Sequence, residues 1–90
     1  MSAAPRSQGK PHRYPVILLP EAEGGYSVWA ATLPGVVSQG NTEAEALANI
    51  REALEGALQT YQELGESIPW AAEPEPAAAG AETRWIEVHG

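Results

Sequence analysis

Residues 14–58 read YPVILLPEAEGGYSVWAATLPGVVSQGNTEAEALANIREALEGAL, and this stretch decides the fold. The runs at 16–19 and 26–32 are rich in aliphatic, β-branched and aromatic residues, which favour strands. Between them, residues 21–25 end in two glycines, which can adopt the positive φ that a tight reversal needs. A Leu-Pro-Gly turn then precedes a third short strand at 36–39. The pattern predicts three successive strands joined by tight turns.

After these strands, the sequence predicts one helix from Glu43 to Leu64. Thr42 and Glu45 have the spacing of a capping box, in which hydroxyl and carboxylate satisfy free amides at the helix start. Gly65 suits the position just after the helix. Gly56, inside the helix, costs about 1 kcal/mol relative to Ala, and close packing is the one reason that the sequence offers for it. The apolar residues recur every three or four positions and form one face: Leu47, Ile50, Leu54, Ala57, Leu58, Tyr61 and Leu64.

The remaining segments complete a small α+β domain. Residues 1–12 are polar and are expected to form a disordered lead before the domain, which covers 13–90. Residues 66–83 are rich in Pro, Ala and Glu, which predicts a flexible linker, and Thr83 to His89 is the last strand candidate. The fold class is therefore a two-layer β-β-β-α-β domain with one helix on one sheet. Alternating directions place the last strand parallel to the first, beside it, through a right-handed crossover.

Composition and charge exclude several classes of protein. The chain has 90 residues, 12 acidic residues that are all Glu, 5 Lys or Arg, no Cys and a net charge of −7. This length suits one small domain, not a multidomain enzyme, and the negative field disfavours direct binding of DNA or RNA. The lack of Cys excludes disulfides and thiolate metal sites. No run approaches the ~20 apolar residues of a membrane span, and none resembles a signal peptide, so we expect a cytoplasmic protein away from membranes.

Residues suited to catalysis or metal binding are few. His12 falls in the predicted lead and His89 is next to last, so we expect both to be solvated and without an orienting partner. No nucleophile elbow, phosphate-binding glycine loop or metal-ligand spacing occurs, and the lack of Asp disfavours a two-metal nuclease site. We therefore predict a protein that is not an enzyme, with no catalytic residues, no metal site and no cofactor.

Both sides of the predicted sheet are apolar, because side chains alternate along each strand and few strand residues are polar. One helix covers only one face, so we expect a second chain to cover the other. The predicted interface, in a homo-oligomer (dimer or tetramer) or with another partner, is made of Ile17, Leu19, Trp29, Val37 and Trp85. A one-residue slip of the register would expose a different set instead: Tyr26, Val28, Val16 and Leu18.

Several short motifs of this chain occur together in one known family. They are Gly25-Tyr26 at the start of the second strand, Leu33-Pro34-Gly35, Ser38-Gln39-Gly40 with Thr42, Glu45-Ala46 and Asn49-Ile50. Gly65-Glu66-Ser67-Ile68-Pro69 continues the likeness past the helix. In this combination the chain resembles the HicB-like antitoxin family.

The resemblance implies a partial ribonuclease-H-like fold of order β-β-β-α-β and a non-catalytic role. Members bind a small basic toxin, HicA-like, in bacterial toxin–antitoxin pairs and block its ribonuclease activity, and many self-associate. Many also continue into a DNA-binding segment, whereas Gly90 alone follows the last strand here, so we expect toxin binding without DNA binding. Two alternatives stay open: a solitary homo-oligomeric regulator of unknown ligand, and a minimal ribonuclease-H-like nuclease that uses Glu21 or Glu87.

Overall fold

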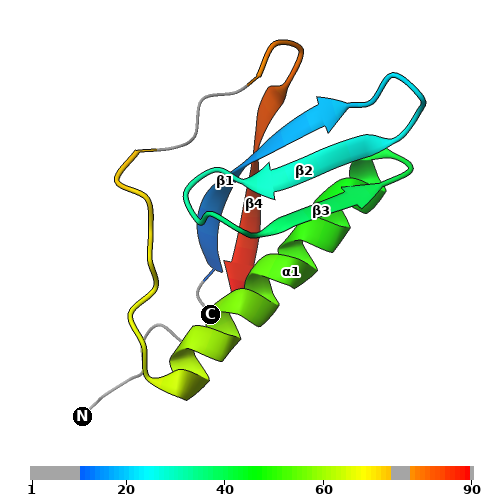
Figure 1. Cartoon of the computed structure of the whole chain (residues 1–90). Coiled ribbons are helices and arrows are strands. Elements are labelled where there is room, and N and C mark those ends of the chain that lie inside the picture. Colours follow the sequence, from blue (N-terminus) through cyan, green and yellow to red (C-terminus); the bar gives the residue numbers. More distant parts are fainter. Residues whose placement is uncertain (1–10, 74–77, 90) are drawn as a thin grey trace.

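The computed structural model describes residues 11–73 and 78–89, and its elements follow the predicted order (Figure 1). They are β1 (Pro11–Pro20), β2 (Tyr26–Ala30), β3 (Val37–Gly40), α1 (Glu43–Leu64) and β4 (Glu82–His89). The strands form one sheet in the order β3-β2-β1-β4, and α1 lies across one face of it (Figure 1). The two-layer α+β fold is confirmed, while residues 1–10 of the predicted lead lie outside the described residues.

The direction of β4 differs from the prediction, because β4 runs antiparallel to β1 and no parallel crossover forms. After α1, residues 65–73 lead back along the side of the sheet, and residues 78–81 lie at its far end, where β4 begins (Figure 1). A helix of 22 residues is roughly 33 Å long. Residues 65–81 can span roughly 55 Å when extended. This segment is therefore long enough to return along the full length of α1 before β4 begins.

Some element boundaries also differ from the prediction. β1 begins at Pro11, inside the predicted lead, and β4 begins at Glu82, inside the predicted linker, because the two strands pair along the whole of β4. β3 begins at Val37, one residue later than predicted, since the amide of Val36 donates to the Leu33 carbonyl in the preceding turn. The hydrogen bonds between paired strands are made by backbone groups and do not depend on the side chain. The strands can therefore be longer than the apolar runs from which a sequence predicts them.

The hydrophobic core lies between α1 and the sheet face that it covers. Val16 and Leu18 of β1 and Val28 of β2 pack with Ile50 and Leu54 of α1, and all are almost completely buried. The buried cluster also contains Ala30, Leu33, Ala46, Ile86 and Val88. The predicted apolar stripe of α1 therefore faces the sheet, except at its end, where Leu64 is 64% exposed. Within the described ranges, α1 does not combine the length and the apolarity that a membrane-crossing helix needs.

The predicted caps fix both ends of α1. The Thr42 hydroxyl accepts a hydrogen bond from the Glu45 amide at 3.1 Å, and the Glu45 carboxylate accepts one from the amide before the cap. Gly65 has a φ of 68°, a left-handed conformation that favours glycine, and its amide donates to the Gln62 carbonyl. The helix bounds agree with the prediction because these caps are local features of the sequence.

Gly40 sets how closely α1 approaches the sheet. A Cβ atom at this position would lie 2.4 Å from the backbone nitrogen of Ala46, in the first turn of α1. One turn later, the Asn49 side chain donates to the Gln39 carbonyl at 2.8 Å and holds the helix on β3. Gly56 differs, because a Cβ atom there would meet no atom within 4 Å. Close packing therefore does not explain Gly56.

Replacing these two glycines should change stability in opposite directions. Gly40→Ala forces two backbone segments apart and should lower the free energy of unfolding by about 1–3 kcal/mol. Gly56→Ala should raise it by about 0.5–1 kcal/mol, since alanine is the better helix former. Urea unfolding followed by far-UV circular dichroism measures both changes. A Gly40→Ala protein as stable as the wild type would contradict the close contact.

Candidate interaction surfaces

The residues predicted for the interface all lie on the sheet face turned away from α1, which we call the outer face: Ile17, Leu19, Trp29, Val37 and Trp85. Ile17 lies opposite Trp29, and Trp29 lies opposite Val37, so these side chains share one face. Leu19 and Trp85 fall on the same face by alternation along their strands. The set that a slipped register would have exposed packs on the helix side instead: Tyr26, Val28, Val16 and Leu18.

The outer face is apolar and remains open at both edges. Val37 on β3 and Trp85 on β4 are 65% and 57% exposed, whereas Ile17 between them is only 2% exposed. At one end, the Arg13 guanidinium lies 5.9 Å from the centroid of the Trp85 ring, and Glu87 is opposite Arg13 in the β1–β4 pairing. Large apolar side chains exposed on one face are typical of a protein interface, a role that stays a prediction here.

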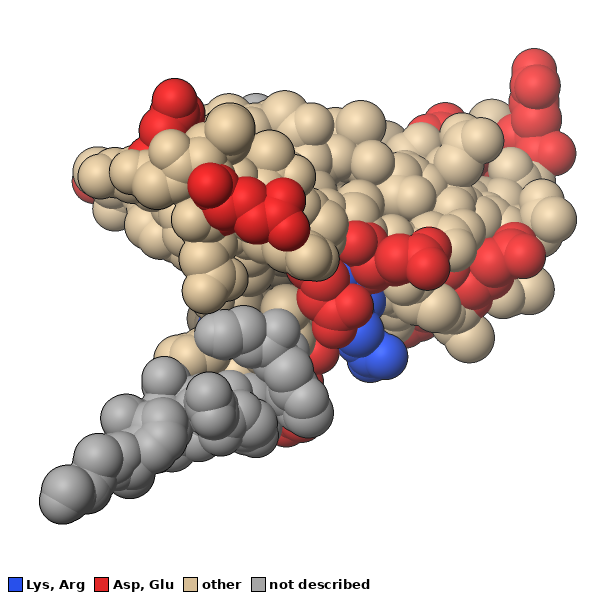
Figure 2. Space-filling view, turned by 90° about the horizontal axis from the view of Figure 1, so that it is seen from below, with Lys and Arg blue, Asp and Glu red and all other residues tan. Residues whose placement is uncertain are grey.

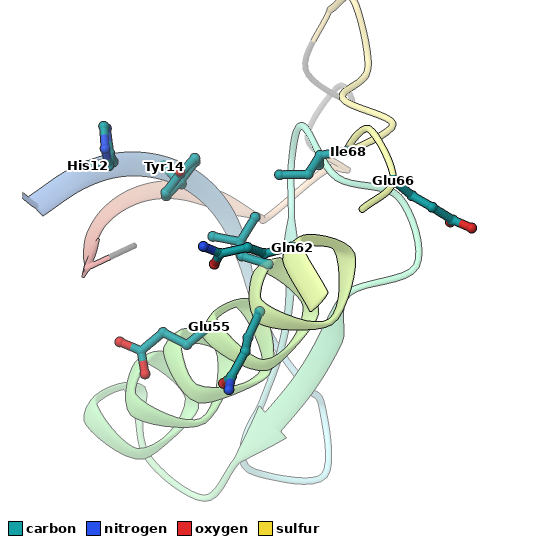
Figure 3. Close-up of a pocket in the computed structure, with 8 residues that line it drawn as sticks. His12, Tyr14, Glu55, Gln62, Glu66 and Ile68 are labelled. Carbon is teal, nitrogen blue, oxygen red and sulfur yellow. The ribbon is translucent and has the colours of Figure 1, made fainter. Parts of the chain in front are cut away.

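A groove of about 730 Å³ lies on the helix side of the sheet, between the second half of α1 and the start of β1 (Figure 3). The segment after α1 forms its third side, and we call it the α1–β1 groove. Its lining residues are His12, Tyr14, Glu55, Leu58, Gln59, Gln62, Glu66 and Ile68. Three separate segments supply them without a shared motif, so the sequence analysis did not find this groove.

Tyr14 is the central aromatic residue of the α1–β1 groove. Its half-buried ring stacks on Trp70, with centroids 5.3 Å apart and an interplanar angle of 10°. Next to Trp70, the Ala71 amide donates to the Thr32 carbonyl at 2.8 Å and attaches this segment to the turn that follows β2. Burial raises the pKa of the Tyr14 hydroxyl, which favours its neutral form. His12, predicted in a disordered lead, lies in β1 with its exposed ring 6.4 Å from that of Tyr14.

The charged side chains of the described surface are mainly acidic. Figure 2 shows acidic side chains along the whole side seen from below, with one small basic area among them. Arg84 binds Glu43 at 2.8 Å and also binds Glu82, and the hydrogen bonds to these carboxylates, that of Glu43 first, raise the pKa of Arg84. A surface of this kind attracts basic proteins and repels nucleic-acid backbones.

The carboxylates considered for a nuclease site do not converge. Glu21 accepts a hydrogen bond from Ser27 just after β1 ends, whereas Glu87 lies opposite Arg13 near the start of β1. Across residues 11–73 and 78–89, no group of three His, Cys, Asp or Glu side chains is placed to hold a metal ion. The side chain of His89 lies outside what the structure describes.

Comparison with known proteins gives consistent matches. The family model of the HicB-like antitoxin of bacterial toxin–antitoxin systems matches residues 14–86. The chain is 40% identical to Antitoxin HicB of Escherichia coli K12 over 76 residues, which are 84% of this chain and 51% of that protein. It is 39% identical to UPF0150 protein Ta0767 of Thermoplasma acidophilum over 57 residues, which are 63% of this chain and 83% of the relative. The chain therefore spans about half the length of the E. coli antitoxin.

Solved structures support the same fold. The N-terminal domain of Burkholderia pseudomallei antitoxin HicB matches with a TM-score of 0.69 and 30% identity, over 86% of this chain and 98% of that domain. A chain of the HicA3 and HicB3 toxin–antitoxin complex matches with a TM-score of 0.65 over 88% of this chain and all of that chain. At 19% identity, this second likeness shows the fold alone. The fold that the sequence resemblance implied is therefore confirmed.

Burial of Tyr14 should make part of the stability depend on alkaline pH. The pKa of Tyr14 is higher in the folded than in the unfolded chain. The contribution of the Tyr14 hydroxyl to the free energy of unfolding is therefore fully present below the pKa of the unfolded chain, about 10, and is lost as the pH rises through the pKa of the folded chain. Tyr14→Phe should therefore lose less free energy of unfolding than the wild type between about pH 9 and pH 11. Urea unfolding at both pH values measures the difference, with Tyr61→Phe as the control. Equal losses in wild type and Tyr14→Phe would contradict it.

Proposed function

The chain belongs to the HicB-like antitoxin family, and on this premise we propose that it neutralises a small basic HicA-like ribonuclease toxin by direct binding. The observation that carries the proposal is the match over residues 14–86, which includes α1, β2, β3 and most of β1. The relative from E. coli is itself named an antitoxin. Binding, not catalysis, is the action that this kinship supports.

The charge of the chain suits a basic partner. The net charge is −7, and acidic side chains are spread along the side of the molecule shown in Figure 2. Opposite charges steer two proteins into encounter and favour one orientation of docking. The same charge works against direct contact with DNA or RNA, so we propose that the chain acts through the toxin alone.

The outer face supports a second contact, between copies of the chain. Val37 and Trp85 expose large apolar surface that a second copy would remove from water. A two-fold contact places the same patch on both copies, so one apolar face is sufficient for a dimer. We propose that the outer face is this self-association surface, with Ile17, Leu19 and Trp29 at its centre and Val37 and Trp85 at its edges.

The alternative functions have less support. A nuclease would need carboxylates that converge, but Glu21 and Glu87 are held at opposite ends of β1. A solitary homo-oligomeric regulator would use the same outer face, and toxin binding is the property that separates it from an antitoxin.

Neutralisation can be measured directly. We expect the adjacent reading frame to encode a small basic protein, and we expect the chain to restore growth of bacteria that express this protein and to stop its RNA cleavage in vitro. Association should slow steeply between about 50 and 200 mM salt, because opposite charges steer the encounter. Stopped-flow fluorescence measures the rate. Unchanged toxicity and RNA cleavage in the presence of soluble, folded chain would contradict the antitoxin role.

Self-association can be tested on the outer face. Val37→Glu combined with Trp85→Glu should convert the wild-type oligomer to a monomer, because each charge would lose its water in the contact. Ala48→Glu, an exposed change on α1, is the control and should leave the oligomer intact. Sedimentation velocity at micromolar concentration measures the assembly state. A wild-type chain that sediments as a monomer would contradict self-association.

A further inference from the structure

The α1–β1 groove has a firm frame that needs no partner to form. Gly65 ends α1 in a left-handed conformation, and the next amide, that of Glu66, donates to the Tyr61 carbonyl at 3.0 Å. This turn directs the following segment away from the helix axis, and the stacking of Trp70 on Tyr14 holds it against β1. A groove whose walls are fixed in advance loses less conformational entropy when a ligand enters.

The lining of the groove combines an apolar floor with an acidic and amide rim. Tyr14, Leu58 and Ile68 are partly buried, and they supply aromatic and aliphatic surface. Figure 3 shows Glu55 on α1 and Glu66 after it on opposite sides of the groove, with the Glu66 carboxylate turned away from Tyr14 and Gln62. An arginine or lysine side chain has matching chemistry, since its hydrocarbon stem packs on apolar surface while its charged end stays at carboxylate or amide oxygens.

The negative charge of the groove is not balanced by the basic side chains that the structure describes. Among the residues that the structure describes, no Lys or Arg lines the groove, and neither Glu55 nor Glu66 forms an ion pair, with Arg51 one helical turn before Glu55 on α1. Arg84 is occupied by Glu43 and Glu82, away from the groove. A cation supplied by a basic partner would complement this acidic lining.

The groove is large enough to receive side chains of another molecule. Its volume is about 730 Å³, within the range of roughly 300–1,000 Å³ that ligand sites occupy. We propose that the α1–β1 groove receives a basic segment of the toxin, with one arginine or lysine whose stem lies along Tyr14 and whose charged end is at Glu55, and a second basic side chain at Glu66. This assignment rests on the proposed function, because it takes the toxin as the basic partner.

The chemistry of the groove can be tested without the toxin. In the full chain labelled with ¹⁵N, N-acetyl-arginine amide at millimolar concentration should shift the amide resonances of Tyr14, Leu58, Gln59 and Gln62. N-acetyl-glutamine amide, which lacks the charge, should shift them much less. Shifts spread evenly over the Glu residues of the chain, or located elsewhere, would overturn the proposal. If deleting residues 1–10 produced the groove shifts in reverse, the chain's own lead would be the occupant and the proposal would also fail.

A matched pair of double variants tests the toxin contact. Glu55→Gln with Glu66→Gln removes the charges of the two acidic lining residues, whereas Glu23→Gln with Glu52→Gln removes two exposed charges that do not line the groove. The groove pair should weaken toxin binding about tenfold and the control pair less than threefold, as expected for partly exposed ion pairs. Isothermal titration calorimetry measures affinity, and circular dichroism confirms that each variant folds.

The outcomes separate this proposal from the proposed function. Tight toxin binding that both pairs weaken equally, or not at all, would overturn the groove assignment and leave the antitoxin role standing. A wild-type chain that binds the arginine compound in the groove but not the toxin would overturn the antitoxin role, and with it the identity of the occupant.

Discussion

The packing of α1 on one face of a four-stranded sheet is the constraint behind most of this structure. The distance of α1 from the sheet is set where Ala46 meets Gly40, because any side chain at that glycine would collide with helix backbone. From this contact α1 passes over the sheet and buries Ile50 and Leu54, while Leu64 at its far end is largely exposed. The same placement leaves the outer face without a helix and opens the α1–β1 groove beside the second half of α1.

The features that the sequence predicted correctly are those governed by neighbouring residues. The helix bounds follow from Thr42, Glu45 and Gly65, which act within one turn of the helix ends. The composition of the outer face follows from alternation, because tight turns fix the register and each strand then divides its residues between two faces. Ile17, Trp29 and Val37 therefore meet across three strands as predicted.

The features that the sequence could not predict depend on long connections. The pattern of Trp85 and Ile86 is compatible with either direction of β4, and residues 65–81 have no periodicity that would indicate where they lead. The α1–β1 groove appears only once the segment after α1 is attached through Trp70 and Ala71. His12 was assigned to the lead for a related reason, because its pairing with β4 depends on a partner more than 70 residues away in the chain.

The two surfaces differ in chemistry in a way that separates their partners. Copies of a chain with a net charge of −7 repel one another, so contact between them costs least where charges are few or balanced. The outer face meets this condition, since its centre is apolar and Arg13 lies opposite Glu87 at one end. The α1–β1 groove has the opposite character, because its described lining contains acidic residues and no Lys or Arg. Because the two surfaces lie on opposite sides of the sheet, an oligomer formed through the outer face would leave every groove accessible to a basic partner.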